Sequence, residues 1–424
     1  MIQPLLIFVA LLVLTLAIRI KEETWYSPFS FFALLWTFII GFSIFTAPEY
    51  FFSASALGFI VVNIFVFYAG GYIAKNKIRT EEAPVKAASG VSTLLSLHLS
   101  VSVFAGFLSL YFLLHDSGVN FMELLNKERL LEVSKTFTNN RYAGERLSPM
   151  TMLCMMIAYS GCLTAGRLYV FSRNARGKLK SIVILLPILL FTMVYTARAV
   201  LINAMFLFLS SLITHYVLMH GRRALLFSKR NLIYMSLALI GVPAMFLITQ
   251  AARMGITKFS ADSLLSLVDH LKVWFSGNVS AFSFWFEQDD KSGQLFKGAY
   301  TFAGLNEWLG GKTRDMGIYG KSFDLDGHFH FSNIYTVFRF MIDDFGPAGT
   351  LLCWFGLGIF CRFLYQKILN GDFVSSAVLS GIMTWILFSF ATSVFAYNTV
   401  LFAWFIFVLI TYFSEKPAAA NGNV

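Results

Sequence analysis

Charged side chains are scarce in this sequence. Asp, Glu, Lys and Arg make up 13% of the 424 residues, whereas hydrophobic residues make up 57%. Soluble domains carry about 25% charged residues, because their surfaces must interact with water. The shortage of charge therefore excludes an ordinary soluble protein and indicates a membrane protein. The net charge of +10 resides in short clusters between apolar runs, so we expect it to set membrane topology and expect no nucleic-acid partner.

Residue patterns for disulfides, metal ions and nucleotides are also missing. The four cysteines lie inside apolar runs without CxxC spacing, so we predict that they pack in the interior. The sequence has no GxxxxGK(S/T) phosphate loop, no GxGxxG in a βαβ setting and no GxSxG turn. The His328–His330 pair lacks a third zinc ligand. We therefore expect neither a bound cofactor nor a metal ion.

Long apolar runs are what the chain has in abundance. A membrane-spanning helix needs about 20 mainly apolar residues, and the sequence holds about eleven such segments. We predict spans at residues 3–18, 28–47, 56–74, 93–114, 149–171, 181–196, 198–219, 231–250, 346–366, 373–395 and 398–413. The predicted fold class is an all-α integral membrane protein, with residues 1–424 forming one polytopic membrane domain.

Basic residues follow the third, fifth and seventh predicted spans, and these three connections can all lie on one side. They contain Lys75, Lys77, Arg79 and Lys86; Arg173, Arg176, Lys178 and Lys180; and Arg222, Arg223, Lys229 and Arg230. Basic connections favour the cytoplasmic side. We predict an outside N-terminus and a cytoplasmic, disordered tail at 414–424.

Two long segments then lie on the outer side. Residues 115–148 form the first outer loop, which contains an amphipathic helical pattern, FMELLNKERLLEVSKTF. Residues 251–345 form the large late loop. Its stretch SADSLLSLVDHLKVWF has apolar residues at helical spacing and is typical of an interfacial helix lying on the bilayer. Residues 287–327 are expected to be irregular, and the middle of this loop to cover a site.

Several arginines fall on the predicted outer face. Arg198 lies in a tight turn between two spans, where an arginine beside a helix N-terminus can bind an anion or simply anchor the span. Arg253 leaves the membrane at the end of the eighth span, and the same two readings apply. Arg141 has Asn, Tyr and Gly neighbours that suit a binding turn. Arg146 and Arg314 are equally or better explained as solvated charges.

The segment at 326–349, DGHFHFSNIYTVFRFMIDDFGPAG, mixes polar and aromatic side chains just before a span. A histidine there can act as a general base, because its pKa lies near neutrality. Tyr335, Arg339 and Asp343 would share one face of a helix, although Arg339 and Asp343 can equally form a plain ion pair.

These features resemble one family. Asn333, Ile334, Tyr335 and Thr336, followed by Asp344, Phe345, Gly346 and Gly349, resemble the N-x-Y-T…DFG-x-x-G signature of bacterial O-antigen polymerases, the Wzy-type oligosaccharide repeat-unit polymerases. The turn Thr196–Arg198 resembles their arginine turn, and 277–286 with 298–304 resemble the middle of their large periplasmic loop. The order of spans and the late periplasmic loop are also similar.

The resemblance implies a metal-independent, inverting glycosyltransferase of the GT-C class in the bacterial inner membrane. It would join undecaprenyl-diphosphate-linked repeat units at the periplasmic face, with the N-terminus periplasmic and a separate chain-length co-polymerase as a partner. Without a metal ion, a departing diphosphate needs arginines. The predicted catalytic residues are His330 as base, Asp344 as the alternative base, Arg198 and Arg339.

The predicted substrate-binding residues have more general roles. Arg253 would hold the diphosphate with the two catalytic arginines, and Arg141 would reach the second substrate. Asn333, Tyr335 and Thr336 would orient the base or bind sugar. Trp274, Trp285 and Trp308 would stack on sugar rings or anchor the protein at the interface.

Two other functions remain open. An O-antigen ligase has a related topology and also uses arginine and histidine in its late periplasmic loop. A lipid-linked oligosaccharide flippase is a transporter, and transporters tend to carry charged residues deep within their spans. The predicted spans here are nearly free of acids and bases, which argues against transport.

Overall fold

The structure is a computed structural model that describes residues 2–74, 92–223, 244, 246–251, 260–288, 295–310, 322–328, 330–332 and 334–415. Within these ranges, nine helices are long and apolar enough to cross a membrane. One of the nine joins α7 (Ala175–Ile182) to α8 (Leu185–Tyr195). The others are α1 (Ile2–Glu22), α2 (Pro28–Thr46), α3 (Ala54–Ala74), α4 (Thr93–Asp116), α6 (Pro149–Phe171), α9 (Arg198–His220), α13 (Val337–Leu369) and α15 (Asn398–Glu415).

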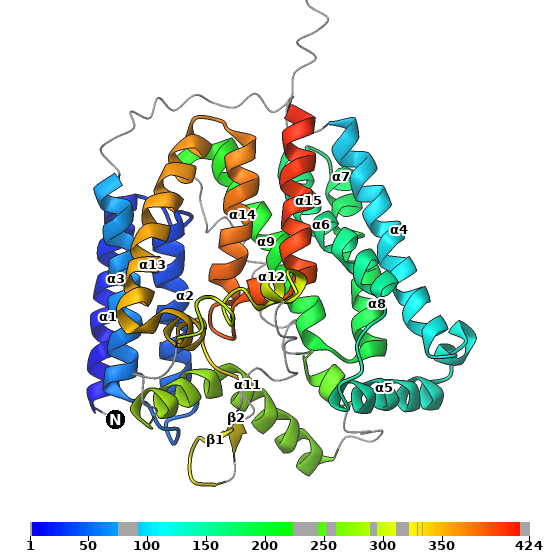
Figure 1. Cartoon of the computed structure of the whole chain (residues 1–424), viewed down its shortest axis with the longest axis horizontal. Coiled ribbons are helices and arrows are strands. Elements are labelled where there is room, and N and C mark those ends of the chain that lie inside the picture. The colour runs from blue at the N-terminus through cyan, green and yellow to red at the C-terminus, as the bar shows by residue number, and fades with distance from the viewer. Residues whose placement is uncertain are drawn as a thin grey trace, which may run out of the picture.

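The helices form one bundle in which neighbours in space are often distant in sequence (Figure 1). α3 packs along α13, α4 along α6, and α9 between α6 and the shorter apolar helix α14 (Phe373–Phe388). Small residues allow close helix approach in membranes. A Cβ at Gly70 of α3 would lie 2.2 Å from the carbonyl oxygen of Phe355, and one at Gly358 of α13 would lie 2.1 Å from that of Phe67. These glycines therefore set the α3–α13 contact.

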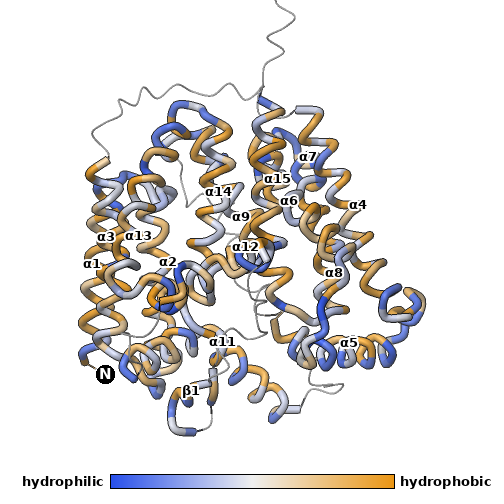
Figure 2. The backbone as a smooth tube through the Cα atoms, in the orientation of Figure 1, coloured by the Kyte–Doolittle hydropathy of each residue, from blue (hydrophilic) through white to orange (hydrophobic). Residues whose placement is uncertain are grey.

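Apolar side chains cover the lipid-facing surface as well as the core. On α1, Leu6 and Val13 are exposed, while Leu11 and Ile18 are buried. Figure 2 shows hydrophobic residues over the length of the bundle and hydrophilic residues gathered at its two ends. This distribution and the nine apolar helices confirm the prediction of an all-α, multi-pass membrane protein.

Two buried ion pairs lie at one end of the bundle, which we call the basic end. Arg362 of α13 donates to both carboxylate oxygens of Glu22 at the end of α1, over 2.9 and 2.5 Å. Arg167 near the end of α6 pairs with Glu415 at the end of α15. The helices that precede the predicted basic connections, α3, α6 and α9, end here too. The Gly71 carbonyl near the end of α3 accepts a hydrogen bond from Arg362, and Arg222 after α9 lies 3.8 Å from Glu23. The relative alternation of the spans thus agrees with the basic clusters (Figure 1).

The opposite end carries most of the segments predicted to lie outside, and we call it the loop layer (Figure 1). It contains η3 (Phe121–Leu125), α5 (Lys127–Tyr142), α11 (Ala261–Gln288), α12 (Ala303–Trp308) and the antiparallel strands β1 (Phe323–Asp324) and β2 (Phe331–Ser332). The amphipathic helix predicted within 115–148 is confirmed as α5, whose Val133 and Phe137 are buried.

Two predicted boundaries differ from the structure. α13 begins at Val337 instead of residue 346, and Gly346, with φ 70° and ψ 172°, kinks it just before Pro347. The helix predicted at 373–395 ends at Phe388 and resumes only as the short η5 (Val394–Ala396). Its Ser389 carbonyl accepts a hydrogen bond from Val337 N–H instead, so packing against α13 replaces helix continuation.

Two further predictions concern the late loop. The helix predicted over 260–275 is longer than expected: α11 continues to Gln288, and its second half is buried beneath the bundle. The first half keeps an exposed apolar side with Leu264 and Leu265. The predicted span at 231–250 lies largely outside the described residues. The disordered tail predicted at 414–424 starts too early, because Ser414 and Glu415 continue α15; residues 416–424 lie outside the described residues.

Candidate functional site

The arginine turn joins α8 to α9 through two residues. Thr196 adopts a left-handed conformation, with φ 53° and ψ 21°, and its buried hydroxyl lies 2.6 Å from that of Thr138 on α5. Arg198 is then the first residue of α9. The tight turn predicted from the sequence is therefore present, and α5 fixes its shape.

Arg198 occupies a position that favours negative charge nearby. Its guanidinium carbon lies 3.7 Å from the ring centroid of Phe246, over the ring face. The N-terminus of a helix carries partial positive charge, which disfavours a cation and favours an anion. An anion placed here would interact favourably with both the arginine and the helix end.

The first outer loop brings a second arginine to this turn. Arg141, in the last turn of α5, lies 5.6 Å from the ring centroid of Tyr195, the residue that ends α8. Arg146 does not join them. It forms an ion pair of 2.7 Å with Glu307 of α12, which links the first outer loop to the late loop.

Arg339 is buried in the first turn of α13. Its guanidinium carbon lies 3.9 Å from the Tyr335 ring centroid and 5.0 Å from that of Trp285 on α11. Its Nε lies 3.7 Å from Asp343 Oδ2, so the predicted ion pair is present but long. Tyr335 precedes the helix, so the three residues do not form one continuous helical face as the sequence suggested.

Asp344 holds the backbone of the late loop. Its two carboxylate oxygens accept hydrogen bonds from the N–H groups of Tyr300 and Thr301, at 3.0 and 2.5 Å. Its own carbonyl accepts one from Lys297 N–H. A carboxylate engaged in this way fixes the chain at 296–301, and this geometry favours a structural role over that of a base.

His330 lies beside a carboxylate that the sequence analysis overlooked. Its Nδ1 is 2.6 Å from Oδ2 of Asp326. Although burial opposes it, hydrogen bonds from the His328 N–H and the His330 ring lower the pKa of Asp326, so this carboxylate is ionised at neutral pH. An ionised carboxylate only accepts hydrogen bonds. In the neutral imidazole, Nδ1 therefore carries the proton and Nε2 keeps the lone pair that a general base needs.

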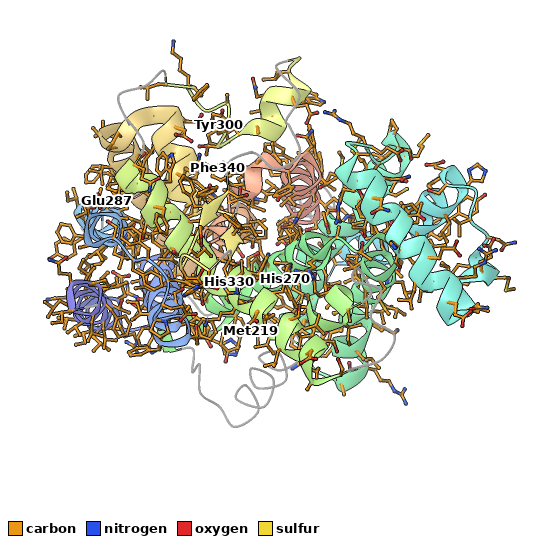
Figure 3. The ribbon with its side chains drawn as sticks, turned by 90° about the horizontal axis from the view of Figure 1, so that it is seen from below. Met219, His270, Glu287, Tyr300, His330 and Phe340 are labelled. Atoms are coloured by element: carbon orange, nitrogen blue, oxygen red, sulfur yellow. The ribbon has the colours of Figure 1, made fainter. Side chains whose placement is uncertain are left out.

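The imidazole of His330 faces an open groove of about 420 Å³. The other lining residues all come from one face of α11: Asp262, Leu265, Ser266, Asp269, His270 and Val273. Figure 3 shows His330 and His270 together near the centre of the loop layer. The spacing of these α11 residues is visible in the sequence as i, i+3, i+4 and i+7. These residues belong to the stretch predicted, from its apolar spacing, to be an interfacial helix.

The structure separates His330 from Arg339. His330 faces residues 262–273 of α11, whereas Arg339 lies over Trp285. A rise of 1.5 Å per residue places these parts of α11 roughly 18 Å apart along its axis. Figure 3 likewise shows Phe340, the neighbour of Arg339, away from His330.

Arg198 contacts α11 through an aromatic ring. Its stacking partner Phe246 lies 5.0 Å, between ring centroids, from Trp274, the residue after groove-lining Val273. Arg198 and Phe246 also line a small pocket of their own. Two groups of candidate residues therefore lie along α11. The groove group contains His330, Asp326 and His270, and the second group contains Arg339, Tyr335 and Trp285.

The remaining predicted residues are less informative. Thr336 is the buried N-cap of α13, and its hydroxyl makes no hydrogen bond within the described part of the chain. Arg253, Arg314 and Asn333 lie outside the described residues. Among the residues that are described, no group of three or more His, Cys, Asp or Glu could hold a metal ion.

Comparison with known proteins gives no relative for this arrangement. No family model, no curated protein and no solved structure matches the chain. The function must therefore be argued from the two groups of residues along α11.

Proposed function

We propose that this protein is a bacterial oligosaccharide repeat-unit polymerase of the O-antigen type. It would transfer a growing glycan from undecaprenyl diphosphate to a repeat unit on a second undecaprenyl diphosphate, without a metal ion. The observation that carries the proposal is the Asp326–His330 pair at a groove along α11, with Arg198 stacked on Phe246, whose ring in turn contacts Trp274 of α11. A base and an anion-binding arginine are the two groups that such a transfer requires.

The proposed reaction uses the groove group for the chemical step. His330 Nε2 takes the proton from the acceptor hydroxyl as the hydroxyl oxygen attacks the anomeric carbon of the donor sugar. The bond from that carbon to the diphosphate oxygen breaks, and the electron pair leaves with the lipid diphosphate. Arg198, helped by the N-terminus of α9, stabilises the negative charge that develops there. Attack opposite to the leaving group inverts the anomeric configuration.

Arg339 has a separate role in this proposal. The reaction involves two lipid diphosphates, and the diphosphate of the acceptor does not react. Several sugars of the repeat unit separate it from the attacking hydroxyl. The separation of roughly 18 Å along α11 between Trp285 and Val273, the nearest groove-lining residue, suits that arrangement. We therefore assign the acceptor diphosphate to Arg339, and Arg141 to the donor beside the α8–α9 turn.

The finer topology belongs to the same proposal. We infer about eleven spans in the inner membrane, with the loop layer on the periplasmic side and both α3 and α15 ending in the cytoplasm. The basic clusters at the opposite end support this orientation. A chain-length co-polymerase remains an expected partner.

The decisive experiment is an assay of purified protein with lipid-linked repeat units in EDTA. The proposal predicts a ladder of polymers with the wild type and at least about a hundredfold less polymer with Arg198→Ala. Exposed Arg173, at the basic end, supplies the matched control: Arg173→Ala should give the normal ladder. Strict dependence on a divalent metal would overturn the proposal.

Cells that lack the protein distinguish the other two functions. Loss of a polymerase leaves lipid A-core capped with a single repeat unit. Loss of a ligase leaves bare core while polymer accumulates on its carrier. Loss of a flippase leaves repeat units on the cytoplasmic side, so neither single repeats nor polymer reach the surface.

A further inference from the structure

The turn after α4 exposes apolar side chains in a loop that is otherwise mainly polar on its surface. Phe121, Met122 and Leu125 of η3 are 56%, 70% and 75% exposed. Exposed polar residues, Asn120 and Asn126, flank them on both sides. Three apolar side chains in one short turn form a patch, which we call the η3 patch, and exposed apolar patches commonly mark an interaction site.

Hydrogen bonds fix the conformation that displays the η3 patch. The Val119 N–H donates to the Leu114 carbonyl over 3.0 Å, around Gly118 with φ 68°, so α4 ends in a Schellman motif. The Asn120 side chain then accepts a hydrogen bond from the Met122 N–H over 3.0 Å. The chain is therefore folded back at once, and η3 stays beside the end of α4.

The length of α4 places this turn at the membrane surface. Its 24 residues extend over about 36 Å, because each residue adds 1.5 Å. The hydrocarbon core of a bilayer is about 30 Å thick, and the bilayer with its headgroups is about 40–45 Å thick. A spanning α4 therefore ends within the headgroup layer, and the Schellman motif keeps η3 at that depth.

The η3 patch follows directly on an exposed apolar side of α4. Phe104, Phe107 and Tyr111 are exposed at spacings of three and four residues, as expected for one lipid-facing side of a helix. The Tyr111 ring packs on His115 in the last turn, with 5.7 Å between ring centroids. Figure 1 shows α4 and the turn after it at the outer edge of the bundle. This continuity with the lipid-facing surface identifies lipid as the occupant of the patch.

α5 connects the η3 patch to the arginine turn. The Ser134 hydroxyl donates to the Met193 carbonyl of α8 over 3.3 Å, and the Thr138 hydroxyl lies 2.6 Å from that of Thr196. The opposite side of α5 carries exposed charged residues, including Lys135. α5 therefore lies across the outer end of α8, with one side on the bundle and the other in water (Figure 1).

We infer that η3 inserts Phe121, Met122 and Leu125 into the bilayer leaflet on the loop-layer side, at the boundary between headgroups and acyl chains. The partner is the lipid bilayer itself. The leaflet then holds one end of α5, while hydrogen bonds hold the helix against the turn that carries Arg198. The inference makes no use of the proposed reaction, so it holds or fails independently of the polymerase.

Fluorescence quenching in phosphatidylcholine nanodiscs, which leave both membrane faces open to water, tests this insertion. Leu125→Cys is made in the full chain together with Cys353→Ser, because the other three cysteines are buried, and it is labelled with the NBD fluorophore. One quencher is phosphatidylcholine with a nitroxide near the head of its acyl chain, and the other is iodide in the water. Lys135→Cys, on the charged side of α5, is the matched control.

For Leu125→Cys, we expect a ratio of lipid quenching to iodide quenching at least about threefold higher than for Lys135→Cys. Met122→Cys should behave like Leu125→Cys, so that the result does not depend on one labelled position. A smaller difference between Leu125→Cys and Lys135→Cys would place the patch in water and overturn the inference. Protection of Leu125→Cys from both quenchers would mean that protein covers the patch, and that result also overturns it.

Discussion

Arginines at the two ends of this bundle have different surroundings. At the basic end, Arg362 and Arg167 are fully buried and each forms a close ion pair with a glutamate. In the loop layer, Arg198 and Arg339 lie over aromatic rings, and the carboxylate beside Arg339 is 3.7 Å away. A guanidinium neutralised by a buried carboxylate joins helices. One that is stacked on rings lies beside an apolar surface that does not neutralise its charge, and a planar guanidinium in that setting suits phosphate recognition.

The largest loss of stability should come from breaking the Arg362–Glu22 ion pair at the basic end. Arg362→Ala leaves Glu22 as an uncompensated buried charge, and it also removes the hydrogen bond to the Gly71 carbonyl. We expect a loss of about 3–5 kcal/mol in the free energy of unfolding, which would lower both the melting temperature in detergent and the amount in membranes. Exposed Arg173→Ala is the control. An unchanged melting temperature for Arg362→Ala would contradict the structural role of this pair.

Replacing the loop-layer arginines should reduce activity strongly and stability only moderately. Arg339→Ala and Arg198→Ala should each reduce polymer at least about a hundredfold, because a charged leaving group or substrate loses its partner. Their melting temperatures should fall less than that of Arg362→Ala. Arg198→Lys should not restore full activity, because lysine lacks the planar fork. If either alanine variant is present at the normal protein level and still makes normal polymer, the role assigned to that arginine is wrong.

Within the loop layer, variants of Asp326 and Asp344 should separate a carboxylate that positions the base from one that stabilises the fold. His330→Gln should reduce the rate by about 10²–10⁴-fold, the usual contribution of a general base. Asp326→Asn should cause a smaller loss and change the pH profile, because Asp326 positions the imidazole. Asp344→Asn should instead lower the melting temperature, since asparagine keeps only one oxygen to accept from the Tyr300 and Thr301 N–H groups and sets an NH2 donor against the other. If Asp344→Asn alone abolishes the rate without destabilisation, Asp344 becomes the better base.

The smallest effect is expected for an ion pair that resembles those of the basic end but is exposed. Arg146 and Glu307 are 2.7 Å apart, with the arginine side chain 57% exposed. Surface pairs contribute at most about 1 kcal/mol. Arg146→Ala should therefore shift the melting temperature slightly and leave polymer formation intact. A large loss of polymer would show that the link between the two outer loops matters for function.

The sequence predicted the bundle well because membrane spans depend on local composition. Ten of the eleven predicted spans coincide with apolar helices or parts of them, and α5 and the Arg198 turn were also anticipated. The errors occur where tertiary contacts override the local pattern. α13 starts earlier than predicted because the Ser389 carbonyl, just after α14, accepts a hydrogen bond from the N–H of Val337, the first residue of α13. α14 stops earlier than predicted because this carbonyl bonds to α13 and does not continue its own helix.

The site was less predictable, for a physical reason. The residue types alone indicated His330, Arg198 and Arg339 as candidates. The part of α11 near which each one lies depends on how this 28-residue helix crosses the bundle, and the local sequence pattern does not specify that. Asp326 could have been predicted as the partner of His330, because it precedes His330 by four residues. His270 and Asp269 were hidden on the polar side of an amphipathic pattern, which is usually solvated. The sequence also predicted that Arg198, Arg253 and Arg339 hold one diphosphate. That stays a prediction, because Arg253 lies outside the described residues and the ring contacts of Arg198 and Arg339 involve different residues.

The most direct test of the account is polymer formation by purified protein with lipid-linked repeat units in EDTA, compared between the wild type, Arg339→Ala and Arg173→Ala. The account predicts a polymer ladder from the wild type and Arg173→Ala and almost none from Arg339→Ala. A wild type that needs a divalent metal, or an Arg339→Ala variant that makes the normal ladder, would contradict it.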